Sequence, residues 1–432
     1  MLITSEKIAK IKDLHSVNCA PYVISCGKEQ KYINEVFGYI KPPYSRLHDC
    51  QGSYGGTYFV DVPNIFRNFD ADENDENNYD FYYSDEYIGA IIKAGTKIVY
   101  RLGVTIEWGS KKYTCNPPKD FAKWARICEH IIMHYNKGWA NGFNYGIEYW
   151  EIWNEPENPP MWTGTKEQFL ELYKVSSKYL KEKFPEIKIG GYGSCGFYAT
   201  FNPDANDFYK SFVIWFEDFL KMCKEENCPL DFYSWHIYTP RVHEIRLSAK
   251  YVKEKLIEYG FVNTESHLNE WNYGAEGGGF DNMDTMIGAG FIATALISMQ
   301  KDKNIDLAQY YCLSPNGTYN GTWNLRTKEY SPVMHVLWAF NRLYSFGQMA
   351  KTENSAKEPD ILAAISEDGN IRVLLSNYKK LGRTSNLDLE GFVDKPIKIY
   401  SLESGAGFKF IKEIRNGEPF YFESGVIYYL EN

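Results

Sequence analysis

The chain has 432 residues and a formal net charge of −9 at pH 7. This acidic balance argues against a general binder of nucleic acid or of acidic membranes. The sequence has no run of about 18 apolar residues, and residues 1–18 lack the apolar segment of a signal peptide, so we expect no membrane span and a cytoplasmic location.

Apolar, β-branched segments alternate with amphipathic helical segments through residues 1–345. Strands are predicted at 16–23, 44–49, 97–103, 147–153, 187–191, 231–238, 267–271 and 305–313. Helices are predicted after them at 28–39, 84–94, 119–135, 165–184, 208–224, 242–259, 283–299 and 332–344, the fourth opening on a Thr165–Gln168 capping box. Eight such units in order predict parallel strands with right-handed crossovers, closed into a (β/α)8 TIM barrel with a sizeable core.

The pattern changes after about Phe346. Strand-like runs at 361–365, 371–375, 397–400 and 426–430 are separated by turns such as the one at 367–370. They predict an accessory antiparallel β-sandwich domain over 346–432. Residues 1–14 are expected either to belong to the catalytic barrel, 1–345, or to add a strand to the β domain.

Two of the predicted barrel strands end in glutamate. The motif Trp-Asn-Glu-Pro occupies 153–156, and Glu270 ends the strand at 267–271. The C-terminal ends of parallel barrel strands meet at one face, where the active site of such barrels lies. Two carboxyl groups about 5–5.5 Å apart can cleave a glycosidic bond with retention, whereas about 6.5–9.5 Å would give inversion. We therefore predict Glu155 and Glu270 as catalytic residues, in a mechanism that needs no metal or organic cofactor.

Three other patterns are set aside. Residues 191–196 have GxGxxG spacing, but no helix opens directly after them to hold a dinucleotide pyrophosphate. Residues 70–74 begin like a calcium loop, but Asp75 stands where Gly is required and Phe81 where Glu is required. The nine cysteines form no close CxxC pair, so neither a disulfide framework nor a metal site is expected.

The segment Tyr-Trp-Glu-Ile-Trp-Asn-Glu-Pro at 149–156 resembles the acid/base motif of clan A retaining glycoside hydrolases. More narrowly, it resembles glycoside hydrolase family 39, the β-xylosidase and α-L-iduronidase family. Arg-Leu-His at 46–48, Trp-Thr-Gly-Thr at 162–165 and His-Ile-Tyr at 236–238 resemble further family motifs. The resemblance implies that Glu155 is the acid/base and Glu270 the nucleophile.

The resemblance also implies roles around these two carboxyl groups. Asn154 would bind the sugar 2-hydroxyl, and Arg46 would keep Glu270 ionised. His48, His236 and Tyr238 would line the sugar subsite. The alternatives are that His236 is a core residue without a sugar contact and that Arg46 only stabilises the barrel floor.

The chain departs from the family pattern in two places. Arg101 stands where the family usually has Glu, and we expect it to bind a carboxylate-bearing or branched sugar, or to pair with Glu107. Two tyrosines end the eighth strand, where relatives carry a Trp platform. The candidates for stacking on the sugar or for other substrate contact are Tyr311, Trp271, Trp323 and Trp108.

The expected function is a retaining exo-glycosidase, β-xylosidase-like, acting on short imported oligosaccharides. Other clan A activities stay open: arabinosidase, β-glucosidase, uronic-acid glycosidase and endo-glycanase. A catalytically idle carbohydrate-binding protein is the alternative from another class. The expected partner is an oligosaccharide or glycoside, with no nucleic acid and no membrane, and the resemblance leaves a homo-oligomer open.

Overall fold

The computed structural model describes residues 1–19, 29–50, 58–276, 278–313, 319, 322–324, 327 and 329–432, with side chains of the first helix described from Asn34 onward. The second part of the strand predicted at 16–23 lies outside these residues.

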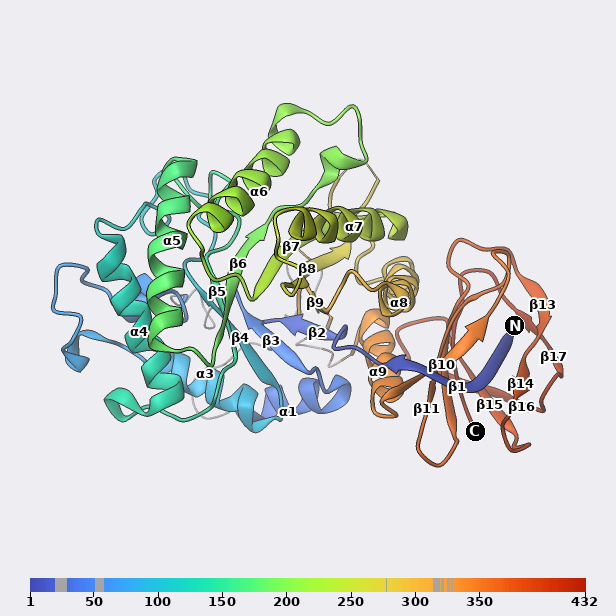
Figure 1. Cartoon of the computed structure of the whole chain (residues 1–432). Coiled ribbons are helices and arrows are strands. Elements are labelled where there is room, and N and C mark those ends of the chain that lie inside the picture. Colours follow the sequence, from blue (N-terminus) through green and yellow to red (C-terminus); the bar gives the residue numbers. More distant parts are fainter. Residues whose placement is uncertain are drawn as a thin grey trace.

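A closed barrel of eight parallel strands forms the larger part of the fold, with neighbours in chain order from β2 to β9 (Figure 1). This confirms the predicted TIM-barrel fold. The strands are β2 Ser16–Asn18, β3 Tyr44–Leu47, β4 Lys97–Leu102, β5 Tyr149–Ile152, β6 Lys188–Ser194, β7 Phe232–Thr239, β8 Glu265–Tyr273 and β9 Leu307–Tyr310.

Helices surround the barrel and connect its strands (Figure 1). They are α1 Glu29–Ile40, α2 Val62–Ile65, α3 Tyr82–Lys93, α4 Phe121–Lys137, α5 Lys166–Lys183, α6 Asp207–Glu225, α7 Val242–Glu258, α8 Met286–Lys301 and α9 Pro332–Tyr344, with 3-10 turns η2 Glu76–Asn78, η3 Trp139–Asn141 and η4 Tyr198–Thr200. The capping box predicted for α5 is present, since Thr165 and Gln168 each bond to the other's backbone N–H.

The remaining strands form an eight-stranded sheet, in the order β14-β1-β10-β11-β12-β18-β15-β16, and the pair β13-β17. All pairs are antiparallel except β1 with β14. The strands are β1 Leu2–Lys10, β10 Gln348–Glu353, β11 Asp360–Ile365, β12 Ile371–Ser376, β13 Arg383–Asn386, β14 Asp388–Glu390, β15 Ile397–Leu402, β16 Lys409–Ile414, β17 Pro419–Phe422 and β18 Ile427–Glu431.

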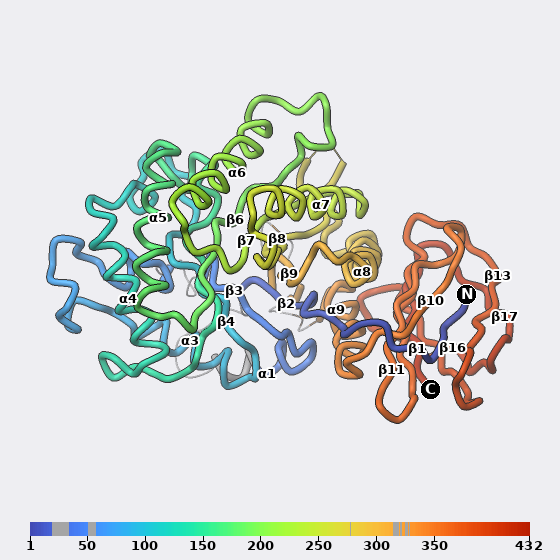
Figure 2. The backbone as a smooth tube through the Cα atoms, in the orientation of Figure 1, coloured from blue at the N-terminus to red at the C-terminus, as the bar shows by residue number. Residues whose placement is uncertain are grey.

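This antiparallel sheet part packs against the barrel through α8 and α9 (Figures 1 and 2). Leu374 and Tyr429 belong to the barrel's hydrophobic core, while Leu375 and Phe422 belong to a second core cluster that draws on both sheets. The domain boundary after residue 345 stays a prediction. It falls between the last residue of α9 and the first residue of β10.

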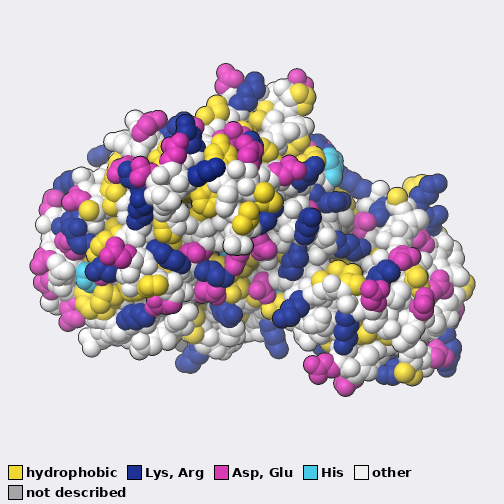
Figure 3. Space-filling model, in the orientation of Figure 1, with side chains coloured by type: hydrophobic (Ala, Val, Ile, Leu, Met, Phe, Trp, Pro, Cys, Tyr) yellow, Lys and Arg dark blue, Asp and Glu magenta, His cyan; other side chains and the backbone are white. Residues whose placement is uncertain are grey.

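Acidic and basic side chains are interspersed over the face shown in Figure 3. Within the described part of the chain, none of the helices has the length and apolar character that crossing a membrane requires.

Candidate active site

The barrel interior is built in layers because side chains alternate between the two faces of each strand. Near the strand starts, five buried side chains form an apolar floor: Tyr44, Val99, Tyr149, Phe232 and Leu307. Two residues further along each of these five strands comes a buried polar side chain: Arg46, Arg101, Glu151, Ser234 and Gln309. The predicted catalytic residues lie beyond this layer. The floor therefore closes the barrel below the site.

Arg46 is the centre of the polar layer. Its Nε donates to Oε2 of Glu151 at 2.6 Å, and its Nη1 to Oδ1 of Asn18 at 3.1 Å. Nη1 also donates to Oε1 of Glu270 at 2.8 Å, and Nη2 to Oδ1 of Asn154 at 2.6 Å. Burial would lower the pKa of Arg46, but the two carboxylates raise it above its ordinary value. One guanidinium thus holds Glu270 and Asn154 in fixed positions.

Glu155 leaves β5 in a tight backbone turn. Trp153, with φ of 72°, and Glu155, with φ of 45°, both adopt the left-handed region that side-chain-bearing residues rarely occupy. The N–H of Glu155 donates to the carbonyls of Tyr192 and Gly193 at 3.1 and 3.0 Å. Nδ2 of Asn158 donates to Oε2 of the carboxylate at 3.1 Å. The neighbouring strand β6 therefore holds this turn in place.

A histidine from β7 faces the Glu155 carboxylate, with Nδ1 of His236 2.7 Å from Oε1. Burial would raise the pKa of Glu155, but the hydrogen bond and charge of His236 lower it below its usual value. Burial would lower the pKa of His236, yet Glu270 and Glu155 raise it above its usual value. Both shifts favour placing the proton of this hydrogen bond on the imidazole.

An irregularity in β8 aims Glu270 into the barrel. The pairing of β8 with β7 shifts by one residue between Trp235 and His236, so Asn269 is an extra residue. Such a bulge re-aims the residues next to it. The Tyr238 hydroxyl donates to Oε2 of Glu270 at 3.0 Å. Both oxygens of Glu270 thus accept hydrogen bonds, which suits an ionised carboxylate.

The close approach of β6 requires glycine at residue 193, which has φ of 66°. A Cβ there would lie 3.0 Å from Oδ1 of Asn154, 3.2 Å from Nη2 of Arg46 and 3.2 Å from Nε2 of His236. A side chain at Gly193 would push these groups apart, so this position protects the spacing of the site.

Oxygens of Glu155 and Glu270 and a nitrogen of His236 lie within 4.8 Å of one another. These residue types could hold a metal ion, and linear spacing did not reveal the set because it comes from three strands. Oε1 of Glu270, however, already accepts from Arg46, and a cation would face the positive charges of Arg46 and His236. The set fits a carboxylate pair better than a metal centre.

Further predicted residues lie around Glu270. Nε2 of His48 is 3.6 Å from Oε1 of Glu270, and burial and Arg46 lower the pKa of His48 well below its usual value. The Tyr311 hydroxyl donates to Oδ2 of Asp49 at 2.6 Å. The predicted residues that the structure brings together in this network are Arg46, His48, Asn154, Glu155, His236, Tyr238 and Glu270.

Two predictions are wrong. Arg101 does not pair with Glu107: its Nη2 donates to Asp61 at 2.6 Å, while Glu107 accepts from backbone N–H groups of residues 113–115. Arg101 has no exposed surface, so the structure does not give it the predicted sugar contact. Trp271 cannot offer a ring to a sugar, because the bulge before it turns it outward into the hydrophobic core.

The other candidate rings differ in placement. Trp323 is buried in the barrel's hydrophobic core, and its stacking role stays a prediction. Trp108 is 73% exposed and lines the same cavity as Glu155. Tyr311 is buried and lies edge-on to Tyr319, with ring centroids 4.8 Å apart.

Several residues of the site were not predicted. Nδ2 of Asn269 and Oγ of Ser234 both donate to Oε1 of Glu151 at 2.6 Å, so this buried carboxylate ties three strands together. Burial would raise the pKa of Glu151, but Arg46 lowers it below its usual value. A glutamate inside a strand that is buried on both faces is the signal that could have identified it.

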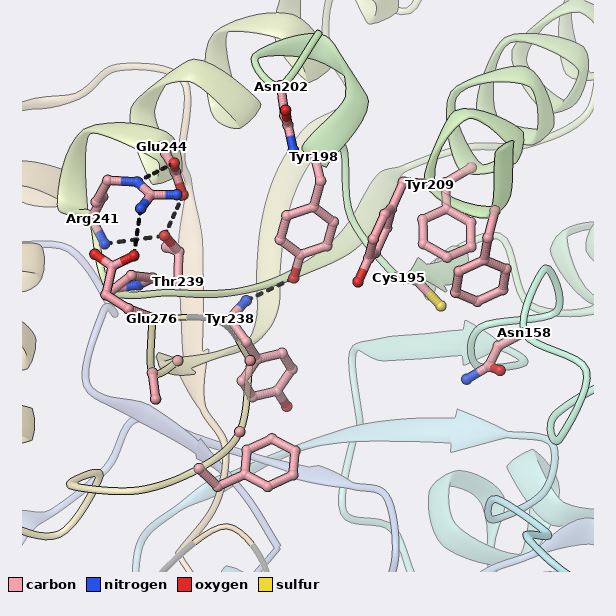
Figure 4. A pocket seen from close by; sticks show the side chains of 18 of the residues that line it. Asn158, Cys195, Tyr198, Asn202, Tyr209, Tyr238, Thr239, Arg241, Glu244 and Glu276 are labelled. Atoms are coloured by element: carbon pink, nitrogen blue, oxygen red, sulfur yellow. Dashed lines mark hydrogen bonds and ion pairs between the residues drawn. The ribbon is translucent and has the colours of Figure 1, made fainter. Parts of the chain in front are cut away.

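Glu155 lines a cavity of about 680 Å³, and Glu270 is not among the lining residues. Figure 4 shows side chains that line this cavity. Tyr198, Cys195 and Asn158 line it next to Glu155. The hydroxyl of Tyr198 accepts from the Tyr238 N–H at 3.0 Å, which links this wall to the residue that donates to Glu270. None of Tyr198, Cys195 and Asn158 was singled out by the sequence, since each lies in a loop or short turn.

The model of the family described as Glycosyl hydrolases family 39 matches residues 54–270, which is half of the chain and includes both glutamates. The chain belongs to glycosyl hydrolase family 39. It is 26% identical over 208 residues to a β-xylosidase from Geobacillus stearothermophilus, covering 45% of this chain and 37% of that protein. It is 25% identical over 213 residues to a β-xylosidase from Caldicellulosiruptor saccharolyticus, covering 45% and 38%. The matches thus span under two fifths of the length of these relatives.

Solved structures share the fold over the whole chain. A glucosidase from Croceicoccus marinus superposes with a TM-score of 0.78 at 20% identity, covering 100% of this chain and 97% of its own. A monomeric β-xylosidase from Caulobacter crescentus superposes with a TM-score of 0.72 at 14% identity, covering 100% and 98%. At these identities the likeness concerns the fold, a barrel joined to a β domain.

Proposed function

We propose that this family 39 chain is a retaining exo-glycosidase that releases a terminal sugar, β-xylosidase-like, from short oligosaccharides or other glycosides. Glu270 attacks the anomeric carbon as the bond to the leaving oxygen breaks, and Glu155 gives that oxygen a proton. Glu155 then takes a proton from water as the water displaces Glu270 from the sugar.

The observation that carries this proposal is the spacing of the two carboxylates. Their oxygens approach to within 4.8 Å, which favours direct attack by Glu270 over the wider gap that admits a water between sugar and base. Both oxygens of Glu270 accept hydrogen bonds, as a nucleophile that must stay ionised requires.

The acid role requires a proton on Glu155, although His236 lowers its pKa in the free protein. The shared hydrogen bond of 2.7 Å supplies that proton. A bound sugar excludes water, and a neutral Glu–His pair is then favoured over an ion pair because desolvation penalises both charges. Substrate binding thus moves the proton from His236 to Glu155.

The choice of sugar rests on the two β-xylosidase relatives, so xylose is the first sugar to test. A panel of aryl glycosides and β-glycosyl fluorides, including xylose, arabinose, glucose and uronic acids, identifies the sugar. Proton NMR of the first product reports its anomeric configuration. A β-anomer released first supports the proposal, and an α-anomer, or no turnover by the wild type, contradicts it.

The nucleophile is tested by Glu270→Gln. This variant should lose at least about 10⁴-fold in kcat, since no residue replaces the attacking oxygen. The cytoplasmic location, the absence of nucleic-acid binding and self-association stay predictions, the last of which sedimentation velocity measures.

A further inference from the structure

The cavity described above reaches one of the two candidate catalytic residues. Glu155 is in its lining and Glu270 is not. The group that protonates the leaving oxygen must touch the leaving group, so the cavity is where the leaving group lies. This step rests on the roles proposed above for the two glutamates.

Aromatic side chains form one continuous wall of this cavity (Figure 4). Tyr198 lies next to Cys195 near Glu155, and its ring centroid is 5.2 Å from that of Tyr209. Tyr209 is 5.7 Å from Phe208, at the first turn of α6. The rings of Phe208 and Tyr209 are 47% and 38% exposed, which leaves apolar faces open to a ligand.

Trp108 reaches the same cavity from the segment that follows β4 and is 73% exposed. A large ring with so much exposed surface gains from covering by another apolar surface. The route out from Glu155 thus offers aromatic surface from two separate segments, α6 with η4 and the chain after β4.

The polar side chains at the far end of the cavity bond to one another. Nε of Arg241 donates to Oε1 of Glu244 at 2.5 Å, and Nη1 donates to Oε2 of Glu276 at 2.9 Å (Figure 4). The Thr239 hydroxyl donates to Glu244 as well. A second sugar needs partners for its hydroxyl groups, and these side chains are already engaged.

We propose that this cavity binds a flat aromatic leaving group, so that the preferred substrates are glycosides of phenols rather than plain oligosaccharides. The phenol leaves with the proton from Glu155 as its bond to the sugar breaks. Neighbouring rings of the wall from Tyr198 to Phe208 are inclined at 62° and 57°, so they offer the phenol both faces and edges. Such contacts bind by area and by the geometry of the aromatic rings, without hydroxyl partners.

The test compares two non-hydrolysable inhibitors that carry the sugar identified by the panel: a phenyl thioglycoside and a thio-linked disaccharide. We expect the phenyl thioglycoside to bind at least about tenfold more tightly. The double variant Phe208→Ala/Tyr209→Ala should remove this preference by weakening only the phenyl compound. Tyr421→Ala, which removes an exposed ring from β17, is the matched control and should leave the ratio unchanged.

Glycosyl fluorides separate the two proposals, because fluoride needs neither a proton from Glu155 nor an aromatic wall. Turnover of the fluoride should be the same in the wild type and the double variant. If fluoride is hydrolysed but the two inhibitors bind equally, or the double variant keeps the wild-type ratio, the aromatic subsite is refuted alone. If the wild type hydrolyses no fluoride of the panel, the glycosidase proposal fails first.

Discussion

Nδ1 of His236 lies 2.7 Å from Oε1 of Glu155, so an imidazole and a carboxylate share one proton in the candidate active site. The same nitrogen is 3.6 Å from Oε2 of Glu270. The charge of Glu270 thereby affects the proton that Glu155 donates in the proposed mechanism. The titration of activity should therefore belong to the pair and not to Glu155 alone.

His236→Asn should change the alkaline limb of the pH profile of kcat/KM. The two carboxylates raise the pKa of His236 above its usual value, so the wild-type pair keeps its proton to higher pH than a free imidazole. Without the imidazole, Glu155 alone must hold the proton. We expect the alkaline limb to move down by about one pH unit and kcat/KM at pH 7 to fall about 10–100-fold.

His267→Asn is the control for this prediction. His267 pairs with Glu265 at the barrel floor, with Nε2 and Oε2 2.9 Å apart, and does not reach the catalytic pair. The pH profile of kcat/KM of this variant should have the same acidic and alkaline limbs as that of the wild type. An unshifted profile in His236→Asn would show that the histidine does not hold the proton.

Arg46→Met should destabilise the protein by about 3–5 kcal/mol, because it leaves the buried carboxylate of Glu151 without its cationic partner. Adding Glu151→Gln should restore part of this loss, since the variant then buries no unpaired charge there. Urea unfolding measures both. Lys119→Met, which breaks an exposed pair with Asp70, should cost less than about 1 kcal/mol.

Tyr238→Phe removes the hydroxyl that donates to Oε2 of Glu270 at 3.0 Å and keeps the ring. A hydrogen bond to a charged group contributes about 1.5–3 kcal/mol, so kcat/KM should fall by about 10–100-fold. Tyr173→Phe removes a buried hydroxyl that donates to the Pro229 carbonyl, away from the site, and should leave kcat/KM unchanged. Equal rates for Tyr238→Phe and wild type would contradict a role of this hydroxyl in orienting Glu270.

Glu157 should make the protein less stable as the pH rises from about 4 to 7. Burial raises its pKa to about 7, and its Oε1 accepts from Ser194 at 2.8 Å. In the unfolded chain the pKa is lower, so the unfolded chain releases this proton first as the pH rises. The contribution of Glu157 to stability is full below about pH 4 and is lost by pH 7 or above, about 3 kcal/mol in total.

Glu157→Gln should remove this pH dependence from the free energy of unfolding measured at pH 5 and pH 8. Glu86→Gln, on the exposed face of α3, should keep the wild-type difference. If both variants show the same pH dependence of the free energy of unfolding, the buried carboxyl of Glu157 does not cause that dependence.

The barrel and the two glutamates could be predicted because both depend on local patterns. Strands and helices alternate in the sequence, Glu155 follows its strand, and Glu270 lies near the end of the strand predicted at 267–271. The network around Arg46 could not be predicted, because Asn18, Glu151 and Asn269 come together only when the barrel closes. The bulge in β8 was also hidden, because this strand is buried on both faces and shows no apolar alternation that an extra residue could interrupt. This is why Trp271 was expected at the site.

The N-terminal strand shows the same limit at longer range. Residues 1–14 were expected either to belong to the barrel or to add a strand to the β domain. The structure shows the strand, but its partners β10 and β14 could not be predicted from the sequence. The pairing of two strands that are separated by a whole barrel in the sequence depends on tertiary packing, which local sequence patterns do not predict.

The place of β1 between β10 and β14 makes the two parts of the protein depend on each other during synthesis. The ribosome makes this strand before any of the barrel, and its partners only after all of it. Cutting the chain after α9 would leave the barrel with an unpaired strand and the remaining sheet with an open gap. Neither fragment is therefore an independent module, and the sheet can form only after the barrel segment has been made.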